Sequence, residues 1–131
     1  MLINNKFDFE KIRKIKKQTF REITLDYDIA FSDVRKYVPF KRVKEFCRDY
    51  KASLFVRRSS NGNSHLKIVL NDRMVFDAFD MLCFRGFFND DKYRLLIDFI
   101  RISRGETFMR LFDVKITKRG IKHAGVWLKV V

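Results

Sequence analysis

The stretch S-L-F-V-R-R-S-S-N-G-N-S-H-L-K-I-V-L, residues 53–70, decides how this chain folds. Two strand-like runs, 53–58 and 65–70, flank the polar sequence S-S-N-G-N-S. Asn61-Gly62 is a strong short-range hairpin signal, because both residue types tolerate positive φ. The stretch therefore predicts a β-hairpin.

A further strand and a helix are predicted before this hairpin. The segment Glu22–Ile29, E-I-T-L-D-Y-D-I, alternates apolar and polar residues, which is typical of a strand with one buried face. Between this strand and the hairpin, Pro39 suits the first turn of a helix whose apolar residues repeat at helical spacing. The chain up to residue 70 is thus expected to read β-α-β-β.

After the hairpin we predict a second helix and a fourth strand. Asn71 or Asp72 can cap the helix, which is expected to end near Gly86. Residues 93–102, Y-R-L-L-I-D-F-I-R-I, are apolar enough for either a buried strand or a buried helix. Their Ile and Phe content and the preceding N-D-D favour a strand. The resulting β-α-β-β-α-β order is that of the α+β ferredoxin-like (RRM-like) fold, in which one sheet face can remain open.

The remaining residues add a helix before this core and a hairpin after it. We predict one domain over 1–131, because a chain of 131 residues with 47% apolar content suits a single core. It is divided into an N-terminal basic helix (1–21, with Asp8 as a candidate cap), the ferredoxin-like core (22–102) and a C-terminal β-hairpin (103–131). The strands of that hairpin are expected at 108–117 and 125–131.

The C-terminal strand leaves an alternative open. Its apolar side chains can either complete the core or pair with a second copy of the chain in a homodimer. These side chains are Val126, Trp127, Val130 and Val131.

The charge of the chain predicts a polyanionic partner. It contains 29 Lys and Arg residues against 16 Asp and Glu residues, a formal net charge of +13. We expect DNA or RNA, in single-stranded form, with solubility alone and acidic lipids as the weaker explanations. The candidate nucleic-acid-binding residues are Arg13, Lys14, Lys17, Arg57, Lys118, Arg119 and Lys122.

No apolar run approaches the roughly 20 residues of a membrane span. We therefore expect a cytoplasmic protein, or one in the host cytoplasm if the source is viral, with no membrane partner.

Two groups of polar residues could carry chemistry. Asp26 and Asp28 lie two residues apart on the predicted strand, so their side chains share a face about 7 Å apart at the backbone. Carboxylates in this arrangement can hold Mg²⁺ or Mn²⁺, although a solvated polar face has the same pattern. At the mouth of the hairpin, a nucleoside triphosphate could be held by hydrogen bonds and point charges. The nucleotide-binding candidates there are Arg58, Ser60, His65 and Lys67.

The order of these groups along the chain resembles the archaeo-eukaryotic primases and primase-polymerases. The resemblance covers about residues 22–102: D-Y-D, a helix, a hairpin with S-S-N-G-N-S-H-L-K-I, another helix, and then I-D at Ile97-Asp98. It implies that Asp26, Asp28 and Asp98 are catalytic and hold the metal, and that Ser60 and His65 contact nucleotide phosphates. Other carboxylates could replace Asp98, namely Asp90, Asp91 or Asp113.

Two functions follow as hypotheses of similar weight. One is a minimal, metal-dependent primase-type nucleotidyltransferase of a DNA replication system, for which the composition suits an archaeal virus or plasmid. The other is a relative without catalysis, either a single-stranded nucleic-acid-binding module or a viral interaction factor. In the module, Tyr27 and Phe55 are the candidates for stacking on bases.

Overall fold

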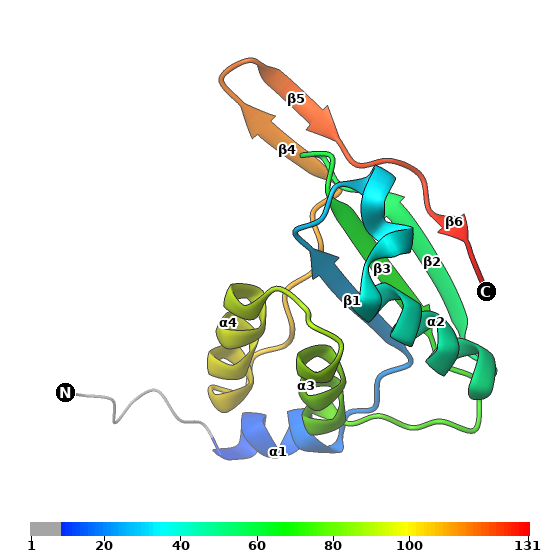
Figure 1. The fold of residues 1–131 in the computed structure, drawn as a ribbon. Coiled ribbons are helices and arrows are strands. Elements are labelled where there is room, and N and C mark those ends of the chain that lie inside the picture. Colours follow the sequence, from blue (N-terminus) through cyan, green and yellow to red (C-terminus); the bar gives the residue numbers. More distant parts are fainter. Residues whose placement is uncertain (1–8) are drawn as a thin grey trace.

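The computed structural model describes residues 9–131, apart from the side chains of Phe9, Ile12, Ile15 and Lys16 (Figure 1). The predicted cap at Asp8 lies outside the described residues. The helices are α1 (Phe9–Lys17), the 3₁₀ helix η1 (Phe31–Lys36), α2 (Val38–Asp49), α3 (Ala78–Phe87) and α4 (Lys92–Ser103). The strands are β1 (Glu22–Tyr27), β2 (Ser53–Arg58), β3 (Ser64–Val69), β4 (Val114–Thr117), β5 (Gly120–His123) and β6 (Leu128–Lys129).

Four strands form the main sheet in the order β1-β3-β2-β6, and every neighbouring pair is antiparallel. The predicted hairpin is confirmed as β2 and β3. Of the two turn residues, only Gly62 adopts a positive φ, at 88°. The α+β class is therefore confirmed.

One face of the sheet forms the core. The alternating apolar residues of β1 (Ile23, Leu25 and Tyr27) are at most 1% exposed on this face. Helix α2 lies across the sheet (Figure 1) and contributes buried apolar side chains such as Val43 to the same cluster. The Tyr27 hydroxyl donates a hydrogen bond to the Phe88 carbonyl at 2.6 Å. Tyr27 is thus a core residue, and the prediction that it stacks on bases is wrong.

The predicted strand over 93–102 is wrong, because this segment forms helix α4. Asp91, which we interpreted as part of a turn before a strand, is the helix N-cap, and its side chain accepts hydrogen bonds from the Tyr93 and Arg94 amides at 2.9 Å. Residues 22–102 thus read β-α-β-β-α-α, and the ferredoxin-like order is not confirmed. The fourth strand is β6, which pairs with β2 at the edge opposite β1.

The start of α4 covers the outer edge of β1. The Asp26 amide donates to Asp90 Oδ1 at 2.8 Å, and the Asp91 amide donates to the Asp26 carbonyl at 3.1 Å. Arg94 Nη1 donates to the Thr24 carbonyl at 3.0 Å. Helix α4 and the turn before it therefore take the place of a neighbouring strand at this edge.

The second face of the sheet is partly covered, although we expected it to be open. The segment 104–113, between α4 and β4, passes behind the sheet on the side opposite α2 (Figure 1). Its Phe108 ring contacts Phe20, with ring centroids 5.0 Å apart, and its Phe112 carbonyl accepts a hydrogen bond from Arg57 Nη2 at 3.3 Å. This segment crosses the face that the ferredoxin-like order was expected to leave open.

A C-terminal hairpin forms, but the predicted pairing of 108–117 with 125–131 is wrong, because β4 covers only Val114–Thr117 and pairs with β5. The hairpin β4-β5 extends away from the body of the molecule (Figure 1), whereas the chain end returns to the main sheet as β6. Val130 and Val131 pack against the core, whereas Val126 is 77% exposed, so completion of the core holds for only part of this set and the homodimer stays a prediction. Within residues 9–131, no helix is long and apolar enough to cross a membrane.

Candidate nucleotide pocket

Three polar side chains form a row across the second face of the sheet. The register places Asp26 opposite His65 in β1 and β3, and His65 opposite Arg57 in β3 and β2. In β1 and β3 the residues on either side of this row are buried, as is Val56 before Arg57 in β2, so the alternation fixes the row on the opposite face. Simple strand alternation thus brings together residues far apart in the chain.

His65 is held in one tautomer. Arg57 Nε donates to His65 Nδ1 at 3.0 Å, so Nδ1 is an acceptor and the proton is on Nε2. Nε2 lies 3.7 Å from Asp26 Oδ1, and both residues line the same pocket. Burial, and then the positive charge of Arg57, lower the pKa of His65 to about 4. A neutral imidazole therefore faces Asp26 at neutral pH.

Asp26 has the opposite shift. Burial raises its pKa to about 6, the Arg94 guanidinium lowers it, and the neighbouring carboxylates of Asp90 and Asp91 raise it again. A carboxyl group with a pKa this close to neutral can exchange a proton near physiological pH. Asp26 and His65 thus form a pair whose proton-binding properties are both changed by this fold.

Arg57 is a structural residue of the site. We predicted it among the nucleic-acid-binding cations, but it is only 4% exposed. Its Nη1 atom donates to Asp113 Oδ1 at 2.6 Å, and its guanidinium lies 4.4 Å from the centroid of the Trp127 ring. These contacts hold Arg57 against His65 and attach the segment before β4 to the sheet.

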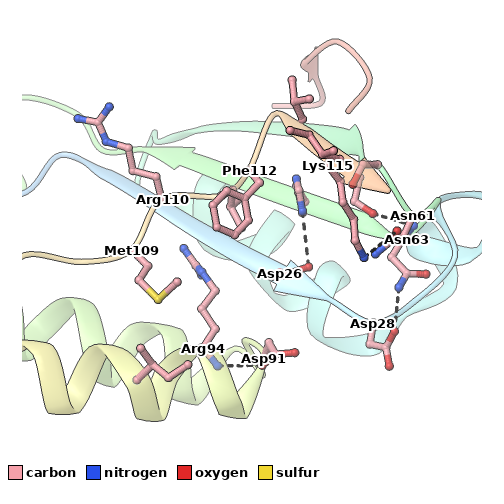
Figure 2. A pocket seen from close by; sticks show the side chains of 17 residues that line it. Asp26, Asp28, Asn61, Asn63, Asp91, Arg94, Met109, Arg110, Phe112 and Lys115 are labelled. Atoms are coloured by element: carbon pink, nitrogen blue, oxygen red, sulfur yellow. Dashed lines mark hydrogen bonds and ion pairs between the residues drawn. The ribbon is translucent and has the colours of Figure 1, made fainter. Parts of the chain in front are cut away.

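A first pocket of about 800 Å³ lies between the β2–β3 hairpin mouth, the start of α4 and the segment 109–116 (Figure 2). Four predicted site residues line it together: Asp26, Asp28, Ser60 and His65. Sequence reasoning did not single out the other prominent lining residues. These are Asn63, Arg94, Arg110, Phe112 and Lys115.

Polar contacts within the first pocket connect its walls. Asn63 Nδ2 donates to Asp28 Oδ1 at 2.8 Å, which ties the hairpin loop to the end of β1 (Figure 2). Lys115 Nζ lies 3.5 Å from Asn61 Oδ1, which brings β4 to the same loop. The residues of segment 109–116 carried no motif, so only the tertiary structure shows that they belong to this site.

The three carboxylates of the predicted metal site are not brought together. Asp98 is 0% exposed, accepts a hydrogen bond from Arg85 Nη1 at 2.6 Å and does not line the first pocket. Within residues 9–131 no group of three or more His, Cys, Asp or Glu side chains is placed to hold a metal ion. The Mg²⁺ or Mn²⁺ site over Asp26, Asp28 and Asp98 therefore does not fit this arrangement.

The alternative carboxylates have different environments. Asp90 is buried between Arg85 Nε and Arg94 Nη1, at 2.6 and 2.8 Å. Asp113 is bound to Arg57. Asp91 alone among the alternatives lines the first pocket with Asp26 and Asp28, although its side chain also caps α4.

A second pocket of about 550 Å³ lies on the other side of the crossing segment. Lys67 lines this second pocket and not the first, so it is separated from Ser60 and His65. Arg58 lines neither pocket and is exposed. The four predicted nucleotide-binding residues are thus divided between three environments.

The predicted surface cations form two separate groups. Arg13, Lys14 and Lys17 are exposed on α1, whereas Lys118, Arg119 and Lys122 are exposed on the β4-β5 hairpin. The helix and the hairpin lie at opposite ends of the molecule (Figure 1). Because β4 also lines the first pocket, the hairpin group is the one that is continuous with it.

Comparison with known proteins finds no matching family model, no matching curated protein and no matching solved structure. The functional argument therefore depends on the geometry of the site.

Proposed function

We propose that this protein binds single-stranded DNA or RNA, with one nucleotide unit in the first pocket. The observation that carries the proposal is the convergence of the hairpin mouth (Ser60, Asn61) with Arg94, Phe112 and Lys115 around one open pocket. Hydrogen-bonding groups, cations and an aromatic ring are the three components that single-strand recognition uses.

Phe112 is the proposed stacking residue. Phe112 is 69% exposed although it lines the pocket, so apolar surface is available to a base. Base–aromatic stacking contributes about 1–3 kcal/mol per base. Phe112 replaces Tyr27 in this role, while Phe55 lies under the Lys67 ammonium, 5.1 Å from its ring centroid.

The hairpin supplies the proposed path for the phosphate backbone. Lys115 and Lys122 are directly opposite each other in β4 and β5, and both are exposed. Like charges in this position repel one another, and a bound polyanion relieves the repulsion. With Lys118 and Arg119 at the turn, they form a positive surface that leads from the first pocket along the hairpin.

The test is oligonucleotide binding by a matched pair of variants. Phe112→Ala should weaken binding of a single-stranded oligonucleotide roughly tenfold, since one stacking contact is removed. Phe79→Ala is the control, because Phe79 is 68% exposed but lies on α3 outside the first pocket. Equal effects of the two substitutions, or no effect of either, would contradict the proposal.

A second candidate function is primase-type nucleotidyl transfer in a replication system. One specific observation favours it: Asp26, Asp28, Ser60 and His65, which the resemblance selects, share the first pocket, and Asp91 joins them there. A nucleoside triphosphate and Mg²⁺ or Mn²⁺ would be the partners that the resemblance implies. Since the described side chains form no three-ligand group, the candidate depends on a direct assay.

That assay is primer synthesis and primer extension with labelled nucleotides and Mn²⁺. Asp26→Asn and Asp28→Asn should each abolish incorporation while oligonucleotide binding is kept. Asp49→Asn, on the exposed end of α2, is the matched control. If the unmodified protein incorporates no nucleotide, the primase-type function is contradicted and only the binding function remains.

A further inference from the structure

The second pocket is lined by five cationic side chains and two acidic ones, Glu22 and Asp113. Asp113 is already engaged by Arg57, and Glu22 lies on the exposed start of β1. The cations come from the sheet, from α3 and α4, and from the crossing segment: Arg57, Lys67, Arg85, Arg94 and Arg110. Three of these cations, Arg57, Arg85 and Arg94, are paired with carboxylates of the protein, so the charge available to a small anion in the cavity comes from Lys67 and Arg110.

Two of these cations have hydrogen-bonding capacity that the protein does not use. Among the side chains described in residues 9–131, two buried nitrogen atoms have no hydrogen-bond partner, Arg85 Nη2 and Arg94 Nε. Arg85 is 1% exposed, and its guanidinium carbon lies 5.6 Å from the Phe108 ring centroid. This cation–π contact offsets only part of the cost of the missing hydrogen bond. An unsatisfied buried donor on a charged group costs about 1–3 kcal/mol or more. Both arginines line the second pocket, so these unsatisfied donors lie in the protein wall beside it.

Lys67 is held in place without a carboxylate partner. Its ammonium lies 4.6 Å from the Trp127 ring centroid and 5.1 Å from that of Phe55. Within the described part of the chain, no Asp or Glu forms an ion pair with Lys67 or with Arg110. Two uncompensated charges therefore face the cavity, and one of them is fixed by aromatic rings.

We infer that the second pocket is a phosphate-binding site, distinct from the nucleotide pocket, in which Lys67 and Arg110 bind a phosphate oxyanion above the floor formed by Arg85 and Arg94. Tetrahedral phosphate matches this set, because its oxygens accept hydrogen bonds from several guanidinium and ammonium donors at once. Arg94, Met109, Arg110 and Leu111 line both pockets, so the two sites share one wall. The phosphate is either free in solution or part of the strand bound in the first pocket; the second source rests on the proposed function.

The experiment titrates the full, isotope-labelled chain with inorganic phosphate and follows the Arg94 Nε–H and Trp127 Nε1–H resonances by NMR. Potassium chloride at equal ionic strength is the reference. We expect saturable shifts of both signals with phosphate only. Lys67→Met and Arg110→Met should each weaken phosphate affinity roughly tenfold, since each removes one charge-assisted contact. Lys41→Met, on an exposed position of α2 outside both pockets, should leave phosphate affinity unchanged.

The outcomes separate the two proposals. Equal shifts with phosphate and chloride, or full phosphate affinity in both Lys67→Met and Arg110→Met, would overturn the second site. Saturable phosphate binding without oligonucleotide binding would support the second site and end the proposed function. If an oligonucleotide displaces inorganic phosphate, the second pocket binds a backbone phosphate of the nucleic acid. If both bind at the same time, the ligand is free phosphate.

Discussion

Arg85 Nη1 lies 2.6 Å from Asp98 Oδ2, and neither residue is more than 1% exposed. The other Asp98 oxygen, Oδ1, accepts a hydrogen bond from the Met109 amide at 2.8 Å. The carboxylate that the resemblance assigns to metal therefore joins α3 and α4 to the segment that crosses the sheet. Its neighbours give Asp98 a structural role.

Loss of this ion pair should destabilise the fold strongly. Asp98→Asn is expected to lower the free energy of unfolding by about 3–5 kcal/mol, because the Arg85 charge remains buried with one partner fewer. Urea unfolding measures the change. Replacement of both partners, Arg85→Met with Asp98→Leu, should recover most of the stability. If Asp98→Asn kept full stability and lost only nucleotide incorporation, Asp98 would be a metal ligand after all.

The pH dependence of His65 is expected to differ from that of an ordinary histidine. Its pKa is about 4 in the folded chain against an ordinary value of 6.5. As pH falls through this window the unfolded chain binds a proton and the folded chain does not, so this residue lowers stability progressively from pH 6.5 to pH 4. An NMR titration of the His65 ring should give a midpoint near 4; a midpoint near 6.5 would contradict the described geometry.

Asp26 should act in the opposite direction. Its pKa is about 6 in the folded chain against an ordinary value of 3.8, so the folded state binds a proton first as pH falls. Stability should therefore rise between pH 6 and pH 3.8 on account of this residue. Asp26→Asn removes that compensation. The free energy of unfolding of the Asp26→Asn variant should fall more steeply below pH 6.5 than that of the unmodified protein. Urea unfolding between pH 6.5 and pH 3.8 measures the difference.

The two groups of surface cations should contribute unequally to oligonucleotide binding. Neutralising Lys118, Arg119 and Lys122 together should lower the slope of log affinity against log salt by about 2, since each lost phosphate contact removes about 0.7 on a single strand. The matched triple variant on α1 replaces Arg13, Lys14 and Lys17 and should change the slope little. A larger effect of the α1 variant would place the bound nucleic acid at α1 and not at the β4-β5 hairpin.

The turn of the β2–β3 hairpin offers a backbone test. Gly62 has φ at 88°, where a side chain is strained, so Gly62→Ala should destabilise the fold by about 1 kcal/mol or more. Gly86→Ala is the control, because Gly86 lies within α3 and its added Cβ would meet Leu95 Cδ2 at 3.4 Å, an ordinary contact. That variant should gain about 0.5–1 kcal/mol. Thermal unfolding of both variants checks the pair.

Local sequence signals predicted the part of the fold that has a clear period. The alternation of 22–29 and the Asn61-Gly62 turn predicted a strand and the hairpin, because a period of two fixes the face of every side chain. The register that places Asp26 opposite His65 comes from the structure. The resemblance, and not these local signals, grouped Asp26 and Asp28 with Ser60 and His65, which line one pocket, and their roles stay predictions.

The strand predicted over 93–102 was wrong because a mostly apolar run has no period that distinguishes a strand from a helix. The missed signal was Asp91 as an N-cap of the helix. Arg94, Phe112 and Lys115 were missed for another reason. They reach the pocket through the path of segment 104–113, which depends on long-range contacts such as Arg57 with Asp113.

The two edges of the main sheet limit how copies of this chain can associate. Along β1 the backbone groups of Thr24 and Asp26 are bonded by Asp90, Asp91 and Arg94. At the other border, among residues 9–131, the outermost strand is β6, which has only two residues. A second molecule would find little backbone to continue the ladder on either side, so stacking of copies into extended fibres is disfavoured. A dimer joined at the main sheet would therefore have to use side chains.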